Sequence, residues 1–250
     1  MRQRLADYRV FWRQFRQAYH TTGAVLPSGR RLSVALSHFV RGSVADGVAD
    51  GVAASAAMTN SAASNSHPPR RILEVGPGTG AVTAQIVRDM RPDDHLTLVE
   101  RNEQFVHYLR DRLNSSDAFQ KTRDRISLVH SGVEDLLDAE PYDLIISGLP
   151  LNNFSVELVD RLLAKMRKLL APGGTLSFFE YVAVRRAKSL VTSRADRQRL
   201  RGIEHILSEL LGKFEIRRDL VLANLPPAWV HHVRLTAASM EHGTGNSERR

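Results

Sequence analysis

The chain of 250 residues contains no cysteine. Disulfide bonds, thiol catalysis and cysteine-ligated zinc are therefore excluded. The ten histidines are scattered, and the adjacent pair His231-His232 falls in an expected strand, so we expect no metal site. No apolar run approaches the roughly 18 residues of a membrane-spanning helix. The N-terminal residues lack the apolar segment of a secretory signal peptide, so we expect a cytoplasmic protein.

Acidic residues are outnumbered. Lysine and arginine total 35 against 27 aspartates and glutamates, which gives a net charge of +8 and a pI of about 10.3. Such a balance favours a polyanionic partner, either nucleic acid or an anionic membrane surface. The hydrophobic content of 42% is sufficient for a core. The length suits one α/β domain with additions.

A glycine-rich turn between a strand and a helix is the clearest motif in the chain. The apolar run within residues 71–75 predicts a buried parallel strand, and a helical pattern begins at Ala81. Three alternating glycines lie between them: Gly76, Gly78 and Gly80. Glycine lets a backbone pass close to a ligand, and the N–H groups at the start of the helix point at the same place. The turn is therefore a candidate ligand site, although a glycine-rich turn can also bind nothing.

Two acidic residues accompany this turn. Glu74 lies within the strand end, where a carboxylate would repel the pyrophosphate of a dinucleotide but suits a ligand with a cationic amino group. Glu100 ends the apolar run at residues 96–99, twenty residues after Gly80. A βαβ nucleotide fold places the carboxylate that binds ribose hydroxyls at that position.

The sequence Glu74-Val75-Gly76-Pro77-Gly78-Thr79-Gly80 resembles the first motif of class I S-adenosylmethionine (SAM) methyltransferases. The resemblance implies that SAM is the cofactor, bound by the glycines, Glu74 and Glu100. It also assigns the adenine to the segment after the strand at residues 126–130. The family often has an acid directly after a glycine there, whereas this chain has Val133, so the Val133 amide or Glu134 is expected to substitute. Ser147, at the end of another strand, completes the expected cofactor site.

The rest of the core alternates strands and helices, which predicts an α/β fold with a mostly parallel sheet, helices on both faces and the ligand at the C-terminal ends of the strands. The resemblance specifies a Rossmann-like class I methyltransferase with seven strands. The last two strands are expected to form an antiparallel pair. The expected strands cover residues 71–75, 96–99, 126–130, 142–147, 175–181, 213–222 and 229–235. The helices expected after the second, fourth and fifth of these strands cover about 102–114, 155–170 and 203–211.

An N-terminal helical extension precedes this core. Residues 2–20 form an amphipathic pattern in which apolar and aromatic residues recur every three or four positions and arginines occupy the other face. This composition is typical of a helix that lies in a membrane interface, although an ordinary helix packed on the domain would look similar. The candidate membrane-binding residues are Arg4, Tyr8, Trp12, Phe15 and Arg16.

A second helix is expected next, with Ser28 as its N-cap. Arg30 and Arg31, near its N-terminus, could contact a phosphate. A direct repeat and a run of small polar residues follow and predict a disordered insertion. Another basic cluster lies at residues 185–201, after the fifth strand, where substrate-covering segments are often inserted. The expected organisation is N-terminal helices at 1–42, the insertion at 43–69, the methyltransferase domain at 70–236 and a disordered tail at 237–250.

Two families share this style of first motif. Ribosomal RNA adenine dimethyltransferases carry an Asn-Leu-Pro-Tyr type of strand tip that holds a flipped adenine. This chain reads Ser147-Gly148-Leu149-Pro150-Leu151, which resembles the bacterial phospholipid N-methyltransferases instead, as do its first helix and residues 22–28 and 224–227. That resemblance implies methylation of phosphatidylethanolamine or an ornithine lipid at the cytosolic membrane surface. RNA adenine methylation is the alternative. The third possibility is a non-enzymatic protein that keeps a vestigial form of this fold and binds membranes or nucleic acid. Such a protein would not bind SAM.

The resemblance also implies roles for residues near the methyl acceptor. Aromatic faces can hold the cation that grows with successive methylations, and the candidates are Tyr19, Tyr181 and Phe154, although a packing role would also explain each of them. His20 is a candidate base. Ser28, Arg30, Arg31 and Leu149 are further candidates for substrate binding. The expected partners are a membrane lipid and an anionic membrane surface, with no metal and no nucleic acid, and we expect a monomer.

Overall fold

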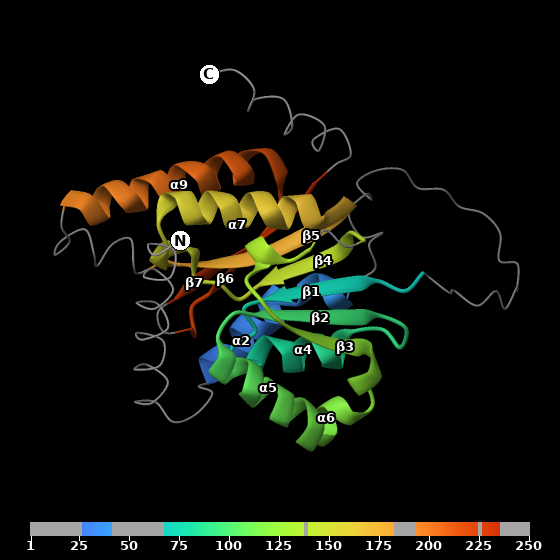
Figure 1. Cartoon of the computed structure of the whole chain (residues 1–250). Coiled ribbons are helices and arrows are strands. Elements are labelled where there is room, and N and C mark those ends of the chain that lie inside the picture. Colours follow the sequence, from blue (N-terminus) through green and yellow to red (C-terminus); the bar gives the residue numbers. More distant parts are fainter. Residues whose placement is uncertain (1–26, 42–67, 138–139, 183–193, 225–226, 236–250) are drawn as a thin grey trace, which may run out of the picture.

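The computed structural model describes residues 27–41, 68–137, 140–182, 194–224 and 227–235. A seven-stranded sheet in the order β3-β2-β1-β4-β5-β7-β6 forms its centre (Figure 1). Strands β1 to β5 pair in parallel, and β7 runs antiparallel to both of its neighbours. The sheet confirms the Rossmann-like methyltransferase prediction. Its strands are β1 (Arg71–Val75), β2 (His95–Glu100), β3 (Ile126–His130), β4 (Tyr142–Ser147), β5 (Leu170–Tyr181), β6 (Glu215–Val221) and β7 (Ala228–Arg234).

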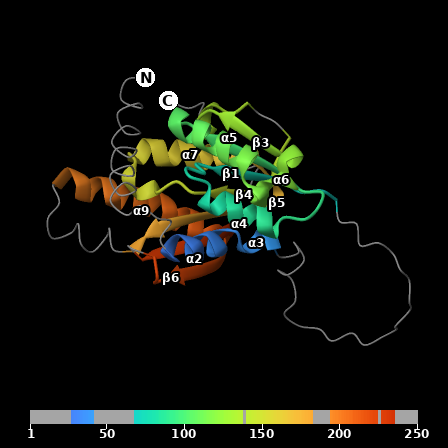
Figure 2. The ribbon, with the colours of Figure 1, turned by 90° about the horizontal axis from the view of Figure 1, so that it is seen from below.

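Helices cover both faces of the sheet (Figures 1 and 2). One face carries α7 (Val156–Leu169) and α9 (Arg194–Phe214), and the other carries α2 (Pro27–Leu36), α4 (Ala81–Asp89) and α5 (Glu103–Ser115). Short helices complete the described part: α3 (His38–Arg41), α6 (Asp117–Gln120), η1 (Arg123–Arg125), η2 (Val133–Asp135) and η3 (Leu151–Asn153).

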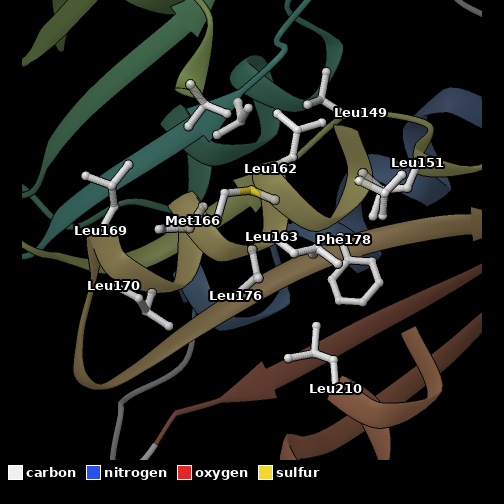
Figure 3. Packing of buried hydrophobic residues seen from close by; sticks show 14 of the residues in the cluster. Leu149, Leu151, Leu162, Leu163, Met166, Leu169, Leu170, Leu176, Phe178 and Leu210 are labelled. Carbon is white, nitrogen blue, oxygen red and sulfur yellow. The ribbon is translucent and has the colours of Figure 1, made fainter. Parts of the chain in front are cut away.

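The core is two apolar layers because successive side chains of each strand point to opposite faces. On one face, Leu162 and Met166 of α7 pack with Leu176 and Phe178 of β5 and with Leu210 of α9 (Figure 3). On the other face, α2, α3 and α4 cover a second cluster of buried side chains. The two layers fix the sheet, and therefore the strand ends that carry the candidate site.

Side-chain caps explain where two helices begin. Asn102 precedes α5, and its side chain accepts hydrogen bonds from the amides of Gln104 and Phe105. Ser155 precedes α7 and accepts from the amide of Leu158. Such caps satisfy amides that have no partner inside the helix.

Three boundaries differ from expectation. Helix α2 begins at Pro27, so Ser28 lies inside the helix and is not its N-cap, because proline is well suited to a first helical turn. Strand β5 begins at Leu170 and bulges: Tyr142 pairs with Leu170, but Leu144 pairs with Thr175. Helix α9 begins at Arg194, so four of the seven basic residues in the cluster at 185–201 belong to the helix and do not precede it.

A buried ion pair fixes the N-terminal helices to the sheet. The guanidinium of Arg70, directly before β1, contacts the Asp94 carboxylate (Nη2···Oδ2 2.6 Å). The same nitrogen donates to the carbonyl of Val40 in α3 (2.8 Å). Most of the predicted N-terminal extension and insertion, and the predicted tail, lie outside the described residues, so those domain predictions stay predictions.

Candidate functional site

The glycine turn after β1 adopts a conformation that needs glycine. Gly76, Gly78 and Gly80 have φ angles of 70°, 57° and 77°, which side-chain-bearing residues rarely adopt. A Cβ on Gly76 would lie 2.5 Å from Cδ2 of Leu149, whereas a Cβ on Gly78 would meet nothing within 4 Å. The turn is therefore closed by packing at Gly76 and has open space at Gly78.

Glu74 carries a fully buried carboxyl group. Its exposed fraction is 0%, and within the described residues neither oxygen has a hydrogen-bond partner of normal geometry. Burial raises the pKa of Glu74 to about 8, and nearby Thr83, which favours the charged form, only partly offsets this. An unpaired buried carboxyl group is costly, so this position suits a ligand that supplies a donor or a cation.

Glu100 ends β2 beside the same turn. Its Oε2 accepts a hydrogen bond from the Gly78 amide (3.1 Å), and its Oε1 accepts one from the Asn102 amide (2.8 Å). Burial raises the pKa of Glu100, while these amides favour its charged form. A carboxylate has about four lone-pair positions, so acceptor capacity remains for ligand hydroxyls.

The segment after β3 carries an ion pair that sequence reasoning missed. Glu134 contacts Arg101 (Oε1···Nη1 2.5 Å), which follows Glu100 directly. A Cβ on Gly132 would lie within 3 Å of both side chains, so the pair covers this glycine. Val133 is buried. The sequence did offer a signal for this ion pair: a basic residue directly follows Glu100, and an acidic residue directly follows Val133.

The tip of β4 lies against the glycine turn. The Gly148 amide donates to the carbonyl of Val75 (2.9 Å), and a Cβ on Gly148 would lie 2.7 Å from the carbonyl oxygen of Gly76. Ser147 is fully buried, and its hydroxyl is 3.4 Å from the Leu149 amide. The structure thus brings together the cofactor residues predicted on β1 and β4.

Two further arginines hold these loops, and sequence reasoning missed both. Arg199 of α9 donates to the carbonyls of Asn152 and Phe154 (2.8 Å each), after the β4 tip. Arg112 of α5 donates to the carbonyl of Thr79 in the glycine turn. Arg199 belongs to the basic cluster at 185–201, so at least this member of the cluster has a structural role. No sequence pattern around Arg199 or Arg112 predicts which carbonyl groups these side chains bind.

Asn152 in η3 is another residue that the sequence analysis did not select. It is buried, and its side-chain nitrogen has no hydrogen-bond partner in the described part of the chain. Asn152 lies just after the β4 tip, so its side-chain amide is a candidate contact for the substrate that accepts the methyl group.

The residues that were predicted to contact the methyl acceptor do not all lie in one part of the structure. Phe154 is only 1% exposed and packs in the apolar cluster with α7, which favours a packing role over a contact with a ligand cation. Tyr181 ends β5 and contacts Phe179 edge to face (5.1 Å), and burial raises its pKa. Leu149 covers Gly76. Arg30 and Arg31 lie on α2, beside β6.

The remaining predicted site residues lie outside the described residues: Tyr19, His20, Arg4, Tyr8, Trp12, Phe15 and Arg16. Ser28 is part of α2. Within the described ranges, no group of three or more histidine, aspartate or glutamate side chains could hold a metal ion. None of the helices described has the length and apolar character needed to cross a bilayer.

Comparison with known proteins shows that part of the chain is similar to methyltransferases. A family model described as a methyltransferase domain matches residues 72–174. The ornithine lipid N-methyltransferase of Singulisphaera acidiphila is 32% identical over 114 residues, which cover 43% of this chain and 56% of that protein. The ubiquinone/menaquinone biosynthesis C-methyltransferase UbiE of Vibrio vulnificus is 29% identical over 119 residues, which cover 47% and 44%. The chain thus spans about half the length of these curated relatives.

Solved structures extend the likeness over most of the chain. The 1,6-didemethyltoxoflavin-N1-methyltransferase of Burkholderia thailandensis superposes with a TM-score of 0.58 at 18% identity, over 94% of this chain and 90% of that one. The N-methyltransferase NodS of Bradyrhizobium japonicum gives 0.54 at 18% identity, over 85% and 98%. The fold is that of the class I SAM-dependent methyltransferases.

SAM is the cofactor of the class I methyltransferase fold, and the residues of this site fit it. The unpaired Glu74 carboxyl suits the amino group of SAM, and the spare acceptor positions of Glu100 suit ribose hydroxyls. The space over Gly78 leaves room for a ligand against the backbone. The Arg101–Glu134 pair stands at the strand end where this fold holds the adenine.

Proposed function

We propose that the protein is a SAM-dependent N-methyltransferase that methylates the amino headgroup of a membrane lipid at the cytosolic membrane surface. The candidate substrates are phosphatidylethanolamine and an ornithine lipid. The observation that carries the proposal is the β4 tip, Ser147 to Leu151, which lies directly on the glycine turn. This tip lacks the asparagine and tyrosine with which RNA adenine methyltransferases hold a base. It resembles the tip of lipid N-methyltransferases instead.

Further support comes from the relative that methylates ornithine lipid, which aligns with part of the chain at 32% identity. The basic and aromatic pattern of residues 2–20 is typical of a helix that lies on an anionic bilayer. The net charge of +8 suits the same surface. A C-methyltransferase of quinone biosynthesis aligns over a similar length, so a decisive experiment must monitor quinones as well as lipids.

The residues at the site have separable tasks in such a reaction. When bound, SAM supplies an electrophilic methyl group, so the protein mainly has to align the attacking amine. Glu74 and Glu100 would hold the cofactor. The β4 tip, whose following loop is fixed by hydrogen bonds from Arg199, limits the directions from which the amine can approach. Leu149 and the buried layer around it exclude water from the strand end.

The test is lipid analysis by mass spectrometry in a bacterium that lacks methylated lipids and expresses the full chain. We expect mono-, di- or trimethylated phosphatidylethanolamine, or a methylated ornithine lipid when that lipid is supplied. A Glu100→Gln variant serves as the impaired control and should produce less methylated lipid, because it weakens the cofactor site and keeps the side-chain size. Unchanged lipids with a soluble, SAM-binding protein would reject the proposal. Altered quinones or methylated ribosomal RNA would then identify the other acceptor.

A further inference from the structure

Helix α2 lies beside the edge strand β6, on the face of the sheet opposite α7 and α9 (Figure 2). A groove lies between these two elements. Its volume is about 770 Å³. Helix α2 and the start of α3 form one wall, and the second half of β6 with the turn after it forms the other. The lining residues are Arg30, Arg31, Val34, Ala35, His38, Arg217, Asp219, Leu220, Val221, Leu222 and Ala223.

The charges of the groove leave two cations without a carboxylate partner. Arg217 is held by Asp219 in a two-point ion pair (Nη2···Oδ1 2.7 Å, Nε···Oδ2 2.8 Å), so these two charges offset each other. Burial and the neighbouring Arg217 lower the pKa of His38, which favours its neutral form. Arg30 and Arg31 are exposed, and no carboxylate in the described part of the chain pairs with either. The groove therefore offers two guanidinium groups to an anion.

Exposed apolar side chains stand beside these arginines. Val34 and Leu220 are each 43% exposed, and Leu222 is 70% exposed. Three exposed apolar side chains that line one groove form a patch that favours a partner with apolar groups, and the neighbouring cations make a purely apolar partner unsuitable. The chemistry that satisfies both features is an amphiphile whose acidic group is attached to acyl chains.

The position of the groove separates it from the methyl-transfer site. Val221 ends β6 opposite Ala228, and Ala228 lies opposite Tyr181 at the end of β5. This is the edge of the sheet at which β1 and β4 also end. However, β6 is three strands from β4, whose tip is the candidate acceptor position, so the two strand ends lie about 14 Å apart at the usual strand spacing. A headgroup such as phosphoethanolamine, with two carbons between phosphate and amine, cannot span that distance.

We infer that the α2–β6 groove is a docking site for an acidic phospholipid of a bilayer, distinct from the lipid that accepts the methyl group. Arg30 and Arg31 bind the phosphate, and Leu220 and Leu222 enter the acyl region beside it. Because the groove opens at the same edge of the sheet as the cofactor site, docking there presents that edge to the bilayer. The inference requires an acidic bilayer and does not require that the acceptor be a lipid.

The test measures binding of the full chain to phosphatidylcholine vesicles with and without phosphatidylglycerol, by co-sedimentation. Two basic residues near a bilayer surface each contribute about 1 kcal/mol, so Arg30→Gln with Arg31→Gln should weaken binding to the acidic vesicles roughly 30-fold. The matched control is Arg110→Gln with Lys121→Gln, which removes the same charge beside the opposite edge of the sheet. Equal losses in both double variants would reduce the effect to net charge and overturn the inference.

A second pair of variants tests the apolar part. Leu222→Asn should weaken binding to acidic vesicles, whereas Leu137→Asn, at a leucine outside the groove that is even more exposed (84% against 70%), should leave it unchanged. No loss in Leu222→Asn would also overturn the docking geometry. Unchanged thermal unfolding confirms that these exposed substitutions leave the fold intact.

Two readouts keep this inference separate from the proposed function. SAM affinity by calorimetry should be the same in the arginine variant and the parent chain, because the groove is remote from the glycine turn. Loss of vesicle binding by the arginine variant would support the groove even if the expressing bacterium contained no methylated lipid. Methylated lipid together with unaltered vesicle binding would reject the groove and keep the function. Loss of RNA binding without loss of vesicle binding would assign the arginines to another partner and reject the groove as a lipid site.

Discussion

The carboxylate of Glu100 accepts a hydrogen bond from the amide of Gly78 at 3.1 Å. This contact joins the end of β2 to the turn after β1, and the second oxygen is held by the Asn102 amide at the start of α5. One side chain thus fixes the glycine turn and retains acceptor positions for a ligand. Structure and binding are coupled at this residue.

Glu100→Gln should weaken SAM binding by about 10- to 100-fold, since a hydrogen bond to a charged group contributes about 1.5–3 kcal/mol. The amide has one acceptor oxygen, and its NH₂ group would face a backbone N–H. Isothermal titration calorimetry measures the change. Glu103→Gln, at an exposed position of α5, is the control and should bind normally. Parent-like affinity in Glu100→Gln would remove Glu100 from the cofactor site.

SAM binding should release a proton near pH 7. The pKa of Glu74 is raised to about 8, so without ligand its carboxyl is mostly protonated at pH 7, and a bound cationic amino group would favour the charged form. Calorimetry in two buffers of different ionisation enthalpy gives the number of protons. Glu74→Gln should abolish the release and bind SAM more weakly. Tight binding with no proton exchange would show that the amino group does not contact Glu74.

Glu74 also links stability to pH. Its folded pKa lies above the unfolded value of 4.5, so its favourable contribution is fully present below pH 4.5 and is lost as the pH rises toward 8. The free energy of unfolding of the parent, relative to Glu74→Gln, should therefore fall across this window by about 1 kcal/mol per pH unit. Urea unfolding at several pH values measures this difference. A flat difference between the two proteins would contradict the raised pKa.

His232 should act in the opposite direction. It is fully buried, its Nδ1 lies 2.7 Å from the Ser177 hydroxyl, and burial lowers its pKa to about 4. The unfolded chain binds a proton below about pH 6.5 while the folded one does not, so stability is lost as the pH falls from 6.5 toward 4. The His232 ring resonances should not titrate between pH 5 and 7 in NMR spectra. A midpoint near 6.5 would contradict this.

Gly76→Ala and Gly78→Ala should separate packing from binding. Both positions have positive φ, which costs alanine about 1–2 kcal/mol. Only Gly76→Ala also forces a Cβ against Leu149, so it should lower the free energy of unfolding more. Gly78→Ala should mainly weaken SAM binding, because its methyl group enters open space. Urea unfolding and calorimetry on both variants provide the measurement. Equal losses of stability would contradict the difference in packing.

Arg199→Ala should loosen the loop after the β4 tip. The substitution removes two hydrogen bonds to the carbonyls of Asn152 and Phe154, and we expect a loss of about 1–3 kcal/mol in unfolding free energy. Arg197→Ala is a matched control, because Arg197 is exposed on the same helix. Hydrogen exchange of the amides at residues 151–154 should accelerate only in the first variant. Equal effects would assign the loss to charge alone.

The local sequence determined much of the fold, because strand and helix patterns depend on neighbours along the chain. The residues at 126–130 and 142–147 form strands with the bounds that their apolar runs predict. Glu74, Gly78 and Glu100 converge at one edge of the sheet, since parallel strands following helical crossovers bring their C-terminal ends together. The α/β fold and the place of its ligand site were therefore predictable from spacing and residue type, and the resemblance of the first motif added the cofactor.

Other features depend on contacts between segments that are distant in sequence. The Arg199 contacts join residues more than 40 positions apart, and the bulge of β5 arises from its register with β4. Phe154 is an aromatic beside the candidate acceptor tip in the sequence, yet the packing of α7 and α9 buries it. The groove at Arg30 and Arg31 exists only because α2 crosses to β6. The sequence by itself predicted which residues bind SAM, because the resemblance rests on short motifs. Tertiary structure alone decided which arginines are fixed to carbonyls and which have no carboxylate partner among the described residues, because pairing depends on distance in space.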